Sequence, residues 1–384
     1  NNTAVGNEAL VSNTSGTSNV AVGEGALKAN TTASKNTAVG KDALEVNTTG
    51  AQNIAVGDFS MNSNTTGSNN TVVGSQALDS NTTASNNTAM GYNAIGVNTT
   101  GTCLNAVGAS ALDANTTGSF NNAFGQNCMG ANTTGHRNTA MGQDSLQANT
   151  TGARNTAVGN SALANNTADN NTAVGNDALA ANTSGTRNSS LGYQALKACT
   201  TGNDNVCIGH DAGNGITTGS ENIFIGSGAA DGGSFSTGSN NIIIGVNSDP
   251  SLGNQTNELK LGNGSTSVFR CNVQTISSLS DVRDKTDIVD IPDGLDFINS
   301  VRPVKYKWDR RIPDDTCGLV RAGFIAQELQ EAQKGSEYLD LIYDADPEFL
   351  EAKQGNLLPV MVKAIQELSA ENTALKARLD AAGL

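Results

Sequence analysis

The stretch SSLSDVRDK at residues 277–285 contains the residue types of a serine hydrolase. Ser280 carries a hydroxyl that becomes a nucleophile when a base removes its proton, and Lys285, five residues later, carries an amine. A lysine acts as that base only when burial or a neighbouring cation lowers its pKa. On residue types alone, a serine and a lysine at this spacing are more typical of a solvated turn than of a catalytic pair.

Metal chemistry and nucleic-acid binding have little support in the composition. The six cysteines lack the CxxC spacing of a zinc site, and the chain has only two histidines. We therefore predict no metal and no cofactor, and we interpret the cysteines as free thiols in small apolar positions. They are Cys103, Cys128, Cys199, Cys207, Cys271 and Cys317. The net charge of −14 argues against a nucleic-acid surface, and no apolar run is long enough to insert into a membrane.

Charge divides the chain near residue 280. Residues 1–280 carry 9 basic residues (Lys or Arg) and 16 acidic residues (Asp or Glu). The much shorter segment 281–384 carries 13 basic and 20 acidic residues. Five of the six prolines also follow residue 280. We predict a repeat region at 1–247, neck strands leading to a cleavage site at 248–280, and a small α+β domain at 281–384.

A 17-residue repeat fills the first of these parts. Each unit contains a triplet such as AVG, and the closing glycines are 17 residues apart except for one step of 16 and a last step of 19. These glycines are Gly6, Gly23, Gly40, Gly57, Gly74, Gly91, Gly108, Gly125, Gly142, Gly159, Gly175, Gly192, Gly209, Gly226 and Gly245. A short fixed period predicts a solenoid in which each unit stacks on its neighbours.

Three further positions recur around each closing glycine. An asparagine stands four residues before it, with Leu104 the one exception, and a larger apolar residue stands one before it. In the first twelve units another apolar residue stands four after it. One unit therefore fits a coil of two short strands and two turns. About fifteen coils, each rising ~4.8 Å, predict a rod on the order of 70 Å long, with asparagine side chains hydrogen-bonded from coil to coil.

The predicted core of one coil is thin. Two sizeable apolar side chains per 17 residues do not offset a backbone entropy cost of roughly 1–2 kcal/mol per residue. We therefore expect three chains to pack around a common axis, with the alanines two before each glycine, such as Ala21 and Ala38, allowing close approach. The predicted fold class is mainly β, a trimeric β-solenoid.

The repeat resembles the head repeats of trimeric autotransporter adhesins and the collar-like repeats of phage tail fibres, which form left-handed parallel β-rolls. The resemblance covers residues 1 to about 247. The units at CIGHDAGNG and NIFIGSGAADGG lose the second leucine, which predicts a change of cross-section over 205–247. Residues 257–277 alternate as expected of neck strands.

After residue 280 the pattern becomes that of an α+β domain. Residues 294–311 predict a short helix that stops at Pro303 and is followed by a strand, and residues 322–333 predict a second helix. A final helix is predicted at about 357–381. Its seam residues alternate in steps of four and three, as in a coiled coil. They are Met361, Ile365, Leu368, Asn372, Leu375 and Leu379.

Asn372 lies within this seam, where a polar residue fixes the register of a coiled coil and weakens it. The alternative is a single amphipathic helix that lies on its own domain. A three-stranded coil is favoured because the predicted rod also needs three chains.

Three motifs of this last part occur in order: SDVRDKTDIVDI, AGFIAQELQE and LLPVMVKAIQELSAENTALKARL. They resemble the C-terminal intramolecular chaperone of phage endosialidases and tail fibres, a domain also classed as a self-cleaving peptidase. The resemblance covers about residues 278–384. It implies that three copies assemble, guide the folding of the fibre before them, and then release themselves by cutting the chain at Ser280.

The same resemblance implies the site residues. Ser280 and Lys285 match the catalytic serine and lysine, Asp281 follows the serine, and Arg283 is expected to orient the segment. The implied cut lies between Ser280 and Asp281. Direct attack by a serine hydroxyl is easier on the preceding carbonyl, that of Leu279, so both bonds remain candidates.

The repeat gives a physical reason for a chaperone at its end. Every 17-residue slip between neighbouring chains restores almost the same contacts, so the repeat does not select its own register. The leading interpretation is a homotrimeric viral tail fibre or spike, made in the host cytoplasm and part of the virion, that binds a host-surface receptor, expected to be a glycan. The alternatives are a cellular adhesin or stalk with the same chaperone, a glycan-degrading tailspike and an ice-binding protein.

Overall fold

The computed structural model describes residues 1–232, 236–250, 254–266, 282–309, 318–344 and 350–383. The chain divides into two compact units, Asn1–Asn263 and Gly264–Leu384.

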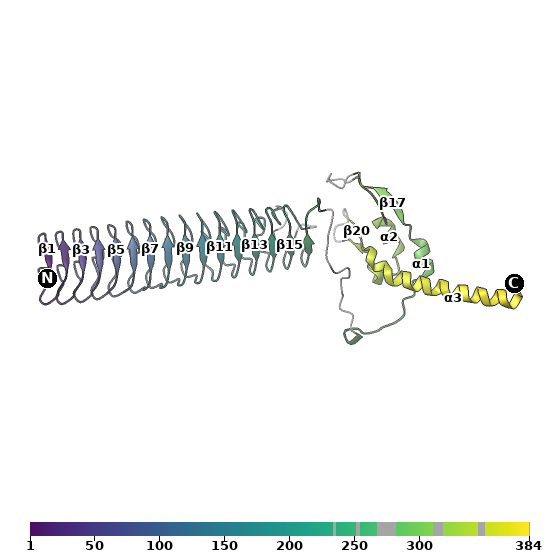
Figure 1. Cartoon of the computed structure of the whole chain (residues 1–384), viewed down its shortest axis with the longest axis horizontal. Coiled ribbons are helices and arrows are strands. Elements are labelled where there is room, and N and C mark those ends of the chain that lie inside the picture. Colours follow the sequence, from purple (N-terminus) through teal and green to yellow (C-terminus); the bar gives the residue numbers. More distant parts are fainter. Residues whose placement is uncertain (233–235, 251–253, 267–281, 310–317, 345–349, 384) are drawn as a thin grey trace. The chain divides into compact units, whose positions relative to one another are not determined.

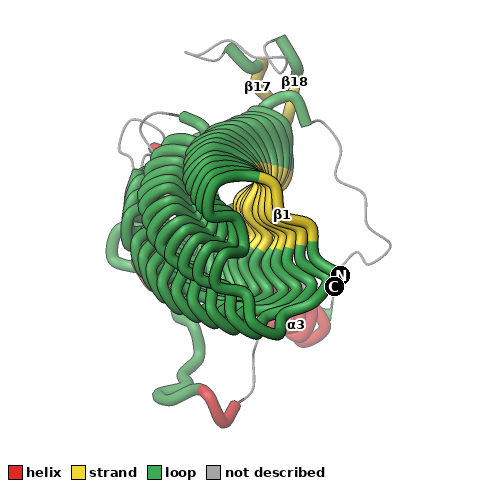
Figure 2. Tube along the Cα trace, turned by 90° about the vertical axis from the view of Figure 1, so that its left-hand side faces the viewer, coloured by secondary structure: helices red, strands yellow, loops and turns green. Residues whose placement is uncertain are grey.

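The first unit is a solenoid with one three-residue strand per coil. Sixteen strands form one parallel sheet in chain order, each hydrogen-bonded to the strand of the next coil (Figure 1). The strands are β1 (Thr3–Val5), β2 (Val20–Val22), β3 (Thr37–Val39), β4 (Ile54–Val56), β5 (Thr71–Val73), β6 (Thr88–Met90), β7 (Asn105–Val107), β8 (Asn122–Phe124), β9 (Thr139–Met141), β10 (Thr156–Val158), β11 (Thr172–Val174), β12 (Ser189–Leu191), β13 (Val206–Ile208), β14 (Ile223–Ile225), β15 (Ile242–Ile244) and β16 (Leu259–Leu261). Viewed along the solenoid, they superpose on one side of the coil (Figure 2).

The sheet extends past residue 247, where the sequence predicts that the repeat ends. Strand β16 lies in the region predicted as neck strands, yet it pairs in parallel with β15 and so adds one more coil to the solenoid. The rest of that predicted neck, residues 267–280, lies outside the described residues.

The other side of each coil consists of turns rather than the second strand that the sequence predicts. Three residues per coil adopt left-handed backbone angles, for example Asp42, Leu44 and Gln52 with φ of 54°, 53° and 59°. Such angles cost about 1–2 kcal/mol for residues other than glycine. Burial of Leu44, whose side chain is inaccessible to solvent, offsets that cost.

The closing glycine of each coil has no possible replacement. Gly40 has φ of 135°, and a Cβ atom on it would lie 2.5 Å from the carbonyl oxygen of Gly57 in the next coil. The glycine column therefore lets consecutive coils approach at the spacing of paired strands.

Inside the coil the small residue of the strand and the leucine of the turn are buried. The residue two before the closing glycine, in most coils an alanine such as Ala38, and the apolar residue four after it, such as Leu44, lie in one continuous core. The expectation that these alanines allow close approach between chains is therefore wrong, because they pack inside their own chain. The residue one before each glycine points outward instead, as Val39 does.

Two ladders of buried asparagine side chains run along this core. In the first, Asn64 Nδ2 donates to Asn47 Oδ1 at 2.8 Å, and Asn81 Nδ2 donates to Asn64 Oδ1 at 2.8 Å. In the second, the backbone N–H of Asn53 donates to Asn36 Oδ1 at 2.9 Å. Nδ2 of Asn64 and Nδ2 of Asn53 both donate to the carbonyl of Gly67, at 3.1 and 2.8 Å. The predicted asparagine ladder is confirmed, and a second accompanies it.

The second ladder is interrupted once and the first twice, in different coils. The second ladder is interrupted at Leu104, whose side chain cannot accept the next bond. The first is interrupted in the 16-residue coil, where Asn166 Nδ2 donates to the carbonyl of Ala168 at 2.8 Å. Asn149 Oδ1 is consequently buried without a hydrogen-bond partner. The further interruption of the first ladder follows Asn182, where Cys199 replaces asparagine and Asn182 Oδ1 is buried without a hydrogen-bond partner. Wherever one ladder is interrupted, the other continues.

The second unit contains three helices and two short antiparallel strand pairs within its described residues. The helices are α1 (Leu295–Ser300), α2 (Ala326–Ala332) and α3 (Leu358–Ala382), the 3₁₀ turns are Val282–Asp284, Glu337–Leu339 and Gln354–Leu357, and the strands are β17 (Val304–Lys307), β18 (Val320–Gly323), β19 (Ile342–Tyr343) and β20 (Glu351–Ala352). Strand β17 pairs with β18, and β19 pairs with β20. The three helices agree with the three that the sequence predicts.

A small core holds this unit together. Phe297, Leu329 and Val360 come from the three helices, and Leu339 and Leu357 come from the 3₁₀ turns. At the start of α1, the backbone N–H of Leu295 donates to the carboxylate of Glu367 on α3 at 2.7 Å. The carboxylate therefore satisfies a helix N-terminus that has no capping side chain of its own.

The ladders predict a large stability difference between two asparagine variants. We expect Asn64→Ala to lower the free energy of unfolding by about 3 kcal/mol, because it leaves Asn47 Oδ1 buried and without a donor. Asn165→Ala is the control, since exposed Asn165 bonds only to the carbonyl of Ala180, and we expect it to cost less than about 1 kcal/mol. Urea denaturation followed by circular dichroism measures both. Equal midpoints would show that the ladder does not stabilise the solenoid.

Candidate functional site

The predicted catalytic segment lies only partly within the described residues. Ser280 and Asp281 lie outside them. Arg283 lies in the 3₁₀ turn Val282–Asp284, and the backbone N–H of Lys285 donates to the carbonyl of Val282 at 3.2 Å. The pairing of Ser280 with Lys285 therefore stays a prediction.

The side chain of Lys285 is exposed in the single chain. A lysine becomes a general base for serine only in a buried or electropositive environment. Any burial of Lys285 must therefore come from residues outside the described part of the chain or from another copy of it.

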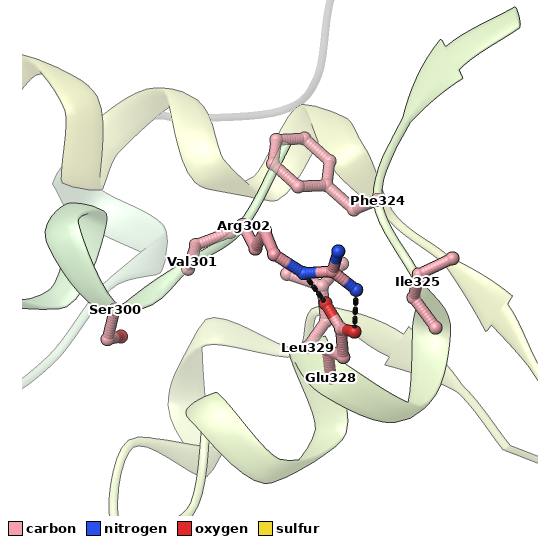
Figure 3. Close-up of a pocket in the computed structure, with 7 residues that line it drawn as sticks. All are labelled: Ser300, Val301, Arg302, Phe324, Ile325, Glu328 and Leu329. Carbon is pink, nitrogen blue, oxygen red and sulfur yellow. Dashed lines mark hydrogen bonds and ion pairs between the residues drawn. The ribbon is translucent and has the colours of Figure 1, made fainter. Parts of the chain in front are cut away.

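A small hollow lies between α1 and α2 (Figure 3). Its walls include Val301, Phe324 and Leu329, and the Arg302 guanidinium lies across it, paired with the Glu328 carboxylate. Hydrogen bonds from Arg302 lower the pKa of the Glu328 carboxyl. The volume, about 10 Å³, is no more than one water molecule requires, so the hollow does not bind a substrate.

The described cysteines are free thiols, as predicted. Cys128, Cys199 and Cys207 are buried, and they stand at positions that other coils fill with a core residue. Burial raises the pKa of Cys128 to about 11, although a hydrogen bond with Ser145 opposes the rise. Thiols with such a pKa are unreactive at neutral pH. Cys271 and Cys317 lie outside the described residues.

The described residues contain no cluster of three or more histidine, cysteine, aspartate or glutamate side chains that could bind a metal. Among them, no helix has the length and apolar character needed to cross a bilayer.

The terminal helix presents its predicted seam to solvent. The apolar seam residues are between 41% and 64% exposed, and Asn372 is exposed among them. They are Met361, Ile365, Leu368, Leu375 and Leu379. The structure confirms the helix, and the partner helices of a coiled coil stay a prediction.

The outward-facing apolar residues of the sheet form a surface that the sequence did not identify. We call the residues one before each closing glycine, together with Leu261, the apolar row. Ten of its sixteen members are between 36% and 59% exposed. They are Val5, Val73, Met90, Phe124, Met141, Leu191, Ile208, Ile225, Ile244 and Leu261. The signal was present in the sequence, because neighbours in a strand point to opposite faces, so a buried alanine requires an outward residue after it.

One protein family matches part of the chain. Residues 280–337 match the model of the family described as the chaperone of endosialidase, Peptidase_S74. The match begins at Ser280 and ends before helix α3. No curated protein and no solved structure shows significant similarity to the chain. A solenoid of about fifteen coils followed by such a segment fits a tail fibre with a C-terminal chaperone domain.

The predicted catalytic pair is tested by self-cleavage. We expect the wild-type chain to separate into two fragments near Ser280 on a denaturing gel, and we expect Ser280→Ala and Lys285→Gln to remain intact, because each removes one partner of the pair. Ser278→Ala is the matched control and should be cleaved like the wild type. A shortened product from Ser280→Ala would exclude this serine as the nucleophile, and the fragment masses identify the bond.

Proposed function

We propose that the chain is a segment of a homotrimeric phage-like tail fibre or tailspike that attaches a virion to a host-cell surface. Its C-terminal part acts as an intramolecular chaperone: it trimerises, sets the register of the solenoid and then releases itself by cutting at Ser280. The observation that carries this proposal is the family match of residues 280–337, which begins shortly after the last strand of the solenoid.

The apolar row supports association of several copies. The row consists of the last residue of each strand and runs along the outer face of the sheet over sixteen coils, a length of roughly 70 Å. A soluble monomer rarely exposes a continuous apolar surface larger than a few hundred Å². Packing the rows of three copies around a common axis buries them and gives each thin core an apolar neighbour.

Helix α3 supports the same stoichiometry. Its exposed seam has the spacing of a coiled coil, in which each seam residue packs between side chains of a partner helix. Asn372 within the seam would disfavour slipped pairings, because slippage places its amide against apolar side chains.

Near-identity of the coils explains why assembly needs a chaperone. Consecutive coils carry equivalent side chains, such as Val39 and Val56 in the apolar row, so a copy shifted by 17 residues finds similar contacts. A trimeric domain that follows β16 in the chain removes this degeneracy, because it aligns the last coils of three chains first. After cleavage the aligned fibre has lost the domain that selected its register, so its stability becomes kinetic.

The proposed interface predicts the mass of the particle. We expect the Ser280→Ala chain, which stays intact, to have three times the 39.1 kDa chain mass in multi-angle light scattering. We expect Ile208→Lys with Ile225→Lys to lower that mass, because two charges per chain would be buried in the interface. Val97→Lys changes an equally exposed apolar residue outside the sheet and should leave the trimer intact. A mass of one chain for Ser280→Ala without further substitutions would refute the trimer.

The chaperone role predicts the behaviour of a truncated chain. We expect residues 1–280, expressed without the remainder, to give aggregates or particles of mixed length, because nothing aligns their coils. Expression of the full chain under the same conditions is the control, and negative-stain electron microscopy with sedimentation measures the difference. Uniform soluble trimers from residues 1–280 would show that the solenoid sets its own register.

A further inference from the structure

All three arginines of residues 1–263 occupy the same position of the coil, five residues before the closing glycine. Arg137, Arg154 and Arg187 have left-handed φ angles of 59°, 58° and 58°. Asparagine adopts such angles at lower cost than a long side chain, and Asn69 and Asn170 stand at the equivalent position in other coils. The backbone therefore does not favour arginine here, which points to a role for the side chains themselves.

Only one of these arginines has an ion-pair partner among the described residues. Arg187 binds Asp204 of the next coil through two hydrogen bonds of 2.6 and 2.7 Å. Arg137 and Arg154 are both exposed, and neither has an ion pair or a side-chain hydrogen bond within the described part of the chain. They stand in consecutive coils, so their backbones are about 4.8 Å apart and their charges repel each other.

An exposed aromatic ring precedes these two arginines in the same column. Phe120 stands one coil before Arg137 and is 54% exposed, again with a left-handed φ, of 61°. Its ring adds an exposed apolar surface to the column that holds the two arginines. We call Phe120, His136, Arg137 and Arg154 the cationic patch.

Backbone donors accompany the patch. In most coils the residue six before the glycine carries a side-chain oxygen that accepts from the backbone N–H one coil earlier, as Ser119 Oγ accepts from Thr102 at 3.1 Å. His136 and Ala153 stand at this position in the next two coils; Ala153 has no side-chain acceptor, and the described residues show no hydrogen bond from the Ser119 N–H to the His136 ring. Within the described residues, the backbone N–H groups of Ser119 and His136 consequently have no acceptor.

We propose that the cationic patch binds an anionic saccharide, a pyranose that carries a carboxylate or phosphate group. This inference deepens the proposed attachment function and rests on it. The anionic group binds between Arg137 and Arg154, whose planar guanidinium groups match two oxygens of a carboxylate or phosphate. The N–H groups of Ser119 and His136 are additional donors, and the apolar face of the sugar ring packs on Phe120.

Charge favours a small anionic ligand over a nucleic acid or a long acidic peptide. The chain has a net charge of −14, so a polyanion that extends beyond the patch is repelled by the surrounding surface. The patch spans two coil intervals, about 10 Å, from Phe120 to Arg154. Its dimensions and its two positive charges suit a short saccharide with one or two acidic groups.

The test compares binding of defined probes to the full Ser280→Ala chain by isothermal titration calorimetry. The probes are digalacturonate, its methyl ester, mannose 6-phosphate, mannose and a hexaglutamate peptide. We expect binding of one or both anionic sugars, and binding of the neutral sugars that is at least about 10-fold weaker. Failure of both anionic sugars to bind, or tighter binding of hexaglutamate than of either sugar, would overturn the proposal.

Substitutions by the residue that other coils use identify the patch. We expect Arg137→Asn with Arg154→Asn to weaken binding by about 10-fold or more, and Phe120→Asn to weaken it by about 5-fold. Arg187→Asn removes an arginine from the same column that is already paired, and it should leave binding unchanged. Thermal denaturation should show no loss of stability, because asparagine suits the left-handed position. Equal weakening by Arg187→Asn would overturn the assignment to the patch.

Adhesion of the fluorescently labelled chain to a panel of bacterial strains distinguishes the saccharide site from the attachment function on which it rests. Adhesion that persists in the Arg137→Asn, Arg154→Asn chain would refute the patch as the receptor site and leave the attachment function standing. Binding of the anionic probe without adhesion of the wild type to any strain would refute attachment and leave the saccharide site standing.

Discussion

The solenoid depends on amide hydrogen bonds inside a core that has little apolar material. A coil buries one leucine or a similar residue and small alanines, and the remaining interior is occupied by two asparagines. Each asparagine satisfies a neighbouring asparagine and a turn carbonyl, such as that of Gly67. Buried amides are stabilising only when their partners are in place, so the coils must stack in one register within a chain.

The sequence predicted the elements of this core better than their orientation. The period, the closing glycine, the buried leucine and the ladder of asparagines four before each glycine each follow from the spacing of one residue type, and the structure contains all four. The orientation of the strand was predicted wrongly: the larger apolar residue, such as Val39, was expected in the core, whereas the structure buries Ala38 and turns Val39 outward. The two asparagines and Leu44 already fill most of the interior, so the inward strand position of this coil takes the small side chain of Ala38. The catalytic pair was predictable only through resemblance to a family, because Ser280 and Lys285 have no distinctive periodicity.

The outward position of the larger residue changes the reason for association. The sequence predicted that chains associate because each core is thin. In the structure the single-chain core is closed by amides, and the unsatisfied surface is the apolar row on the outside of the sheet. Association in the proposed trimer is then driven by an exposed surface and not by an incomplete interior. This distinction separates folding of a coil from pairing of chains, and the proposed chaperone acts on the second step alone.

The staggered interruptions of the two ladders have a mechanical consequence. The first ladder stops between Asn149 and Asn166, where the second continues through Asn155 and Asn171, and the second stops after Leu104, where the first continues through Asn115 and Asn132. A rod pulled along its axis therefore meets interior amide bonds at either of these interruptions and has no weak plane there. Tension applied along the solenoid would therefore be carried by one ladder wherever the other stops.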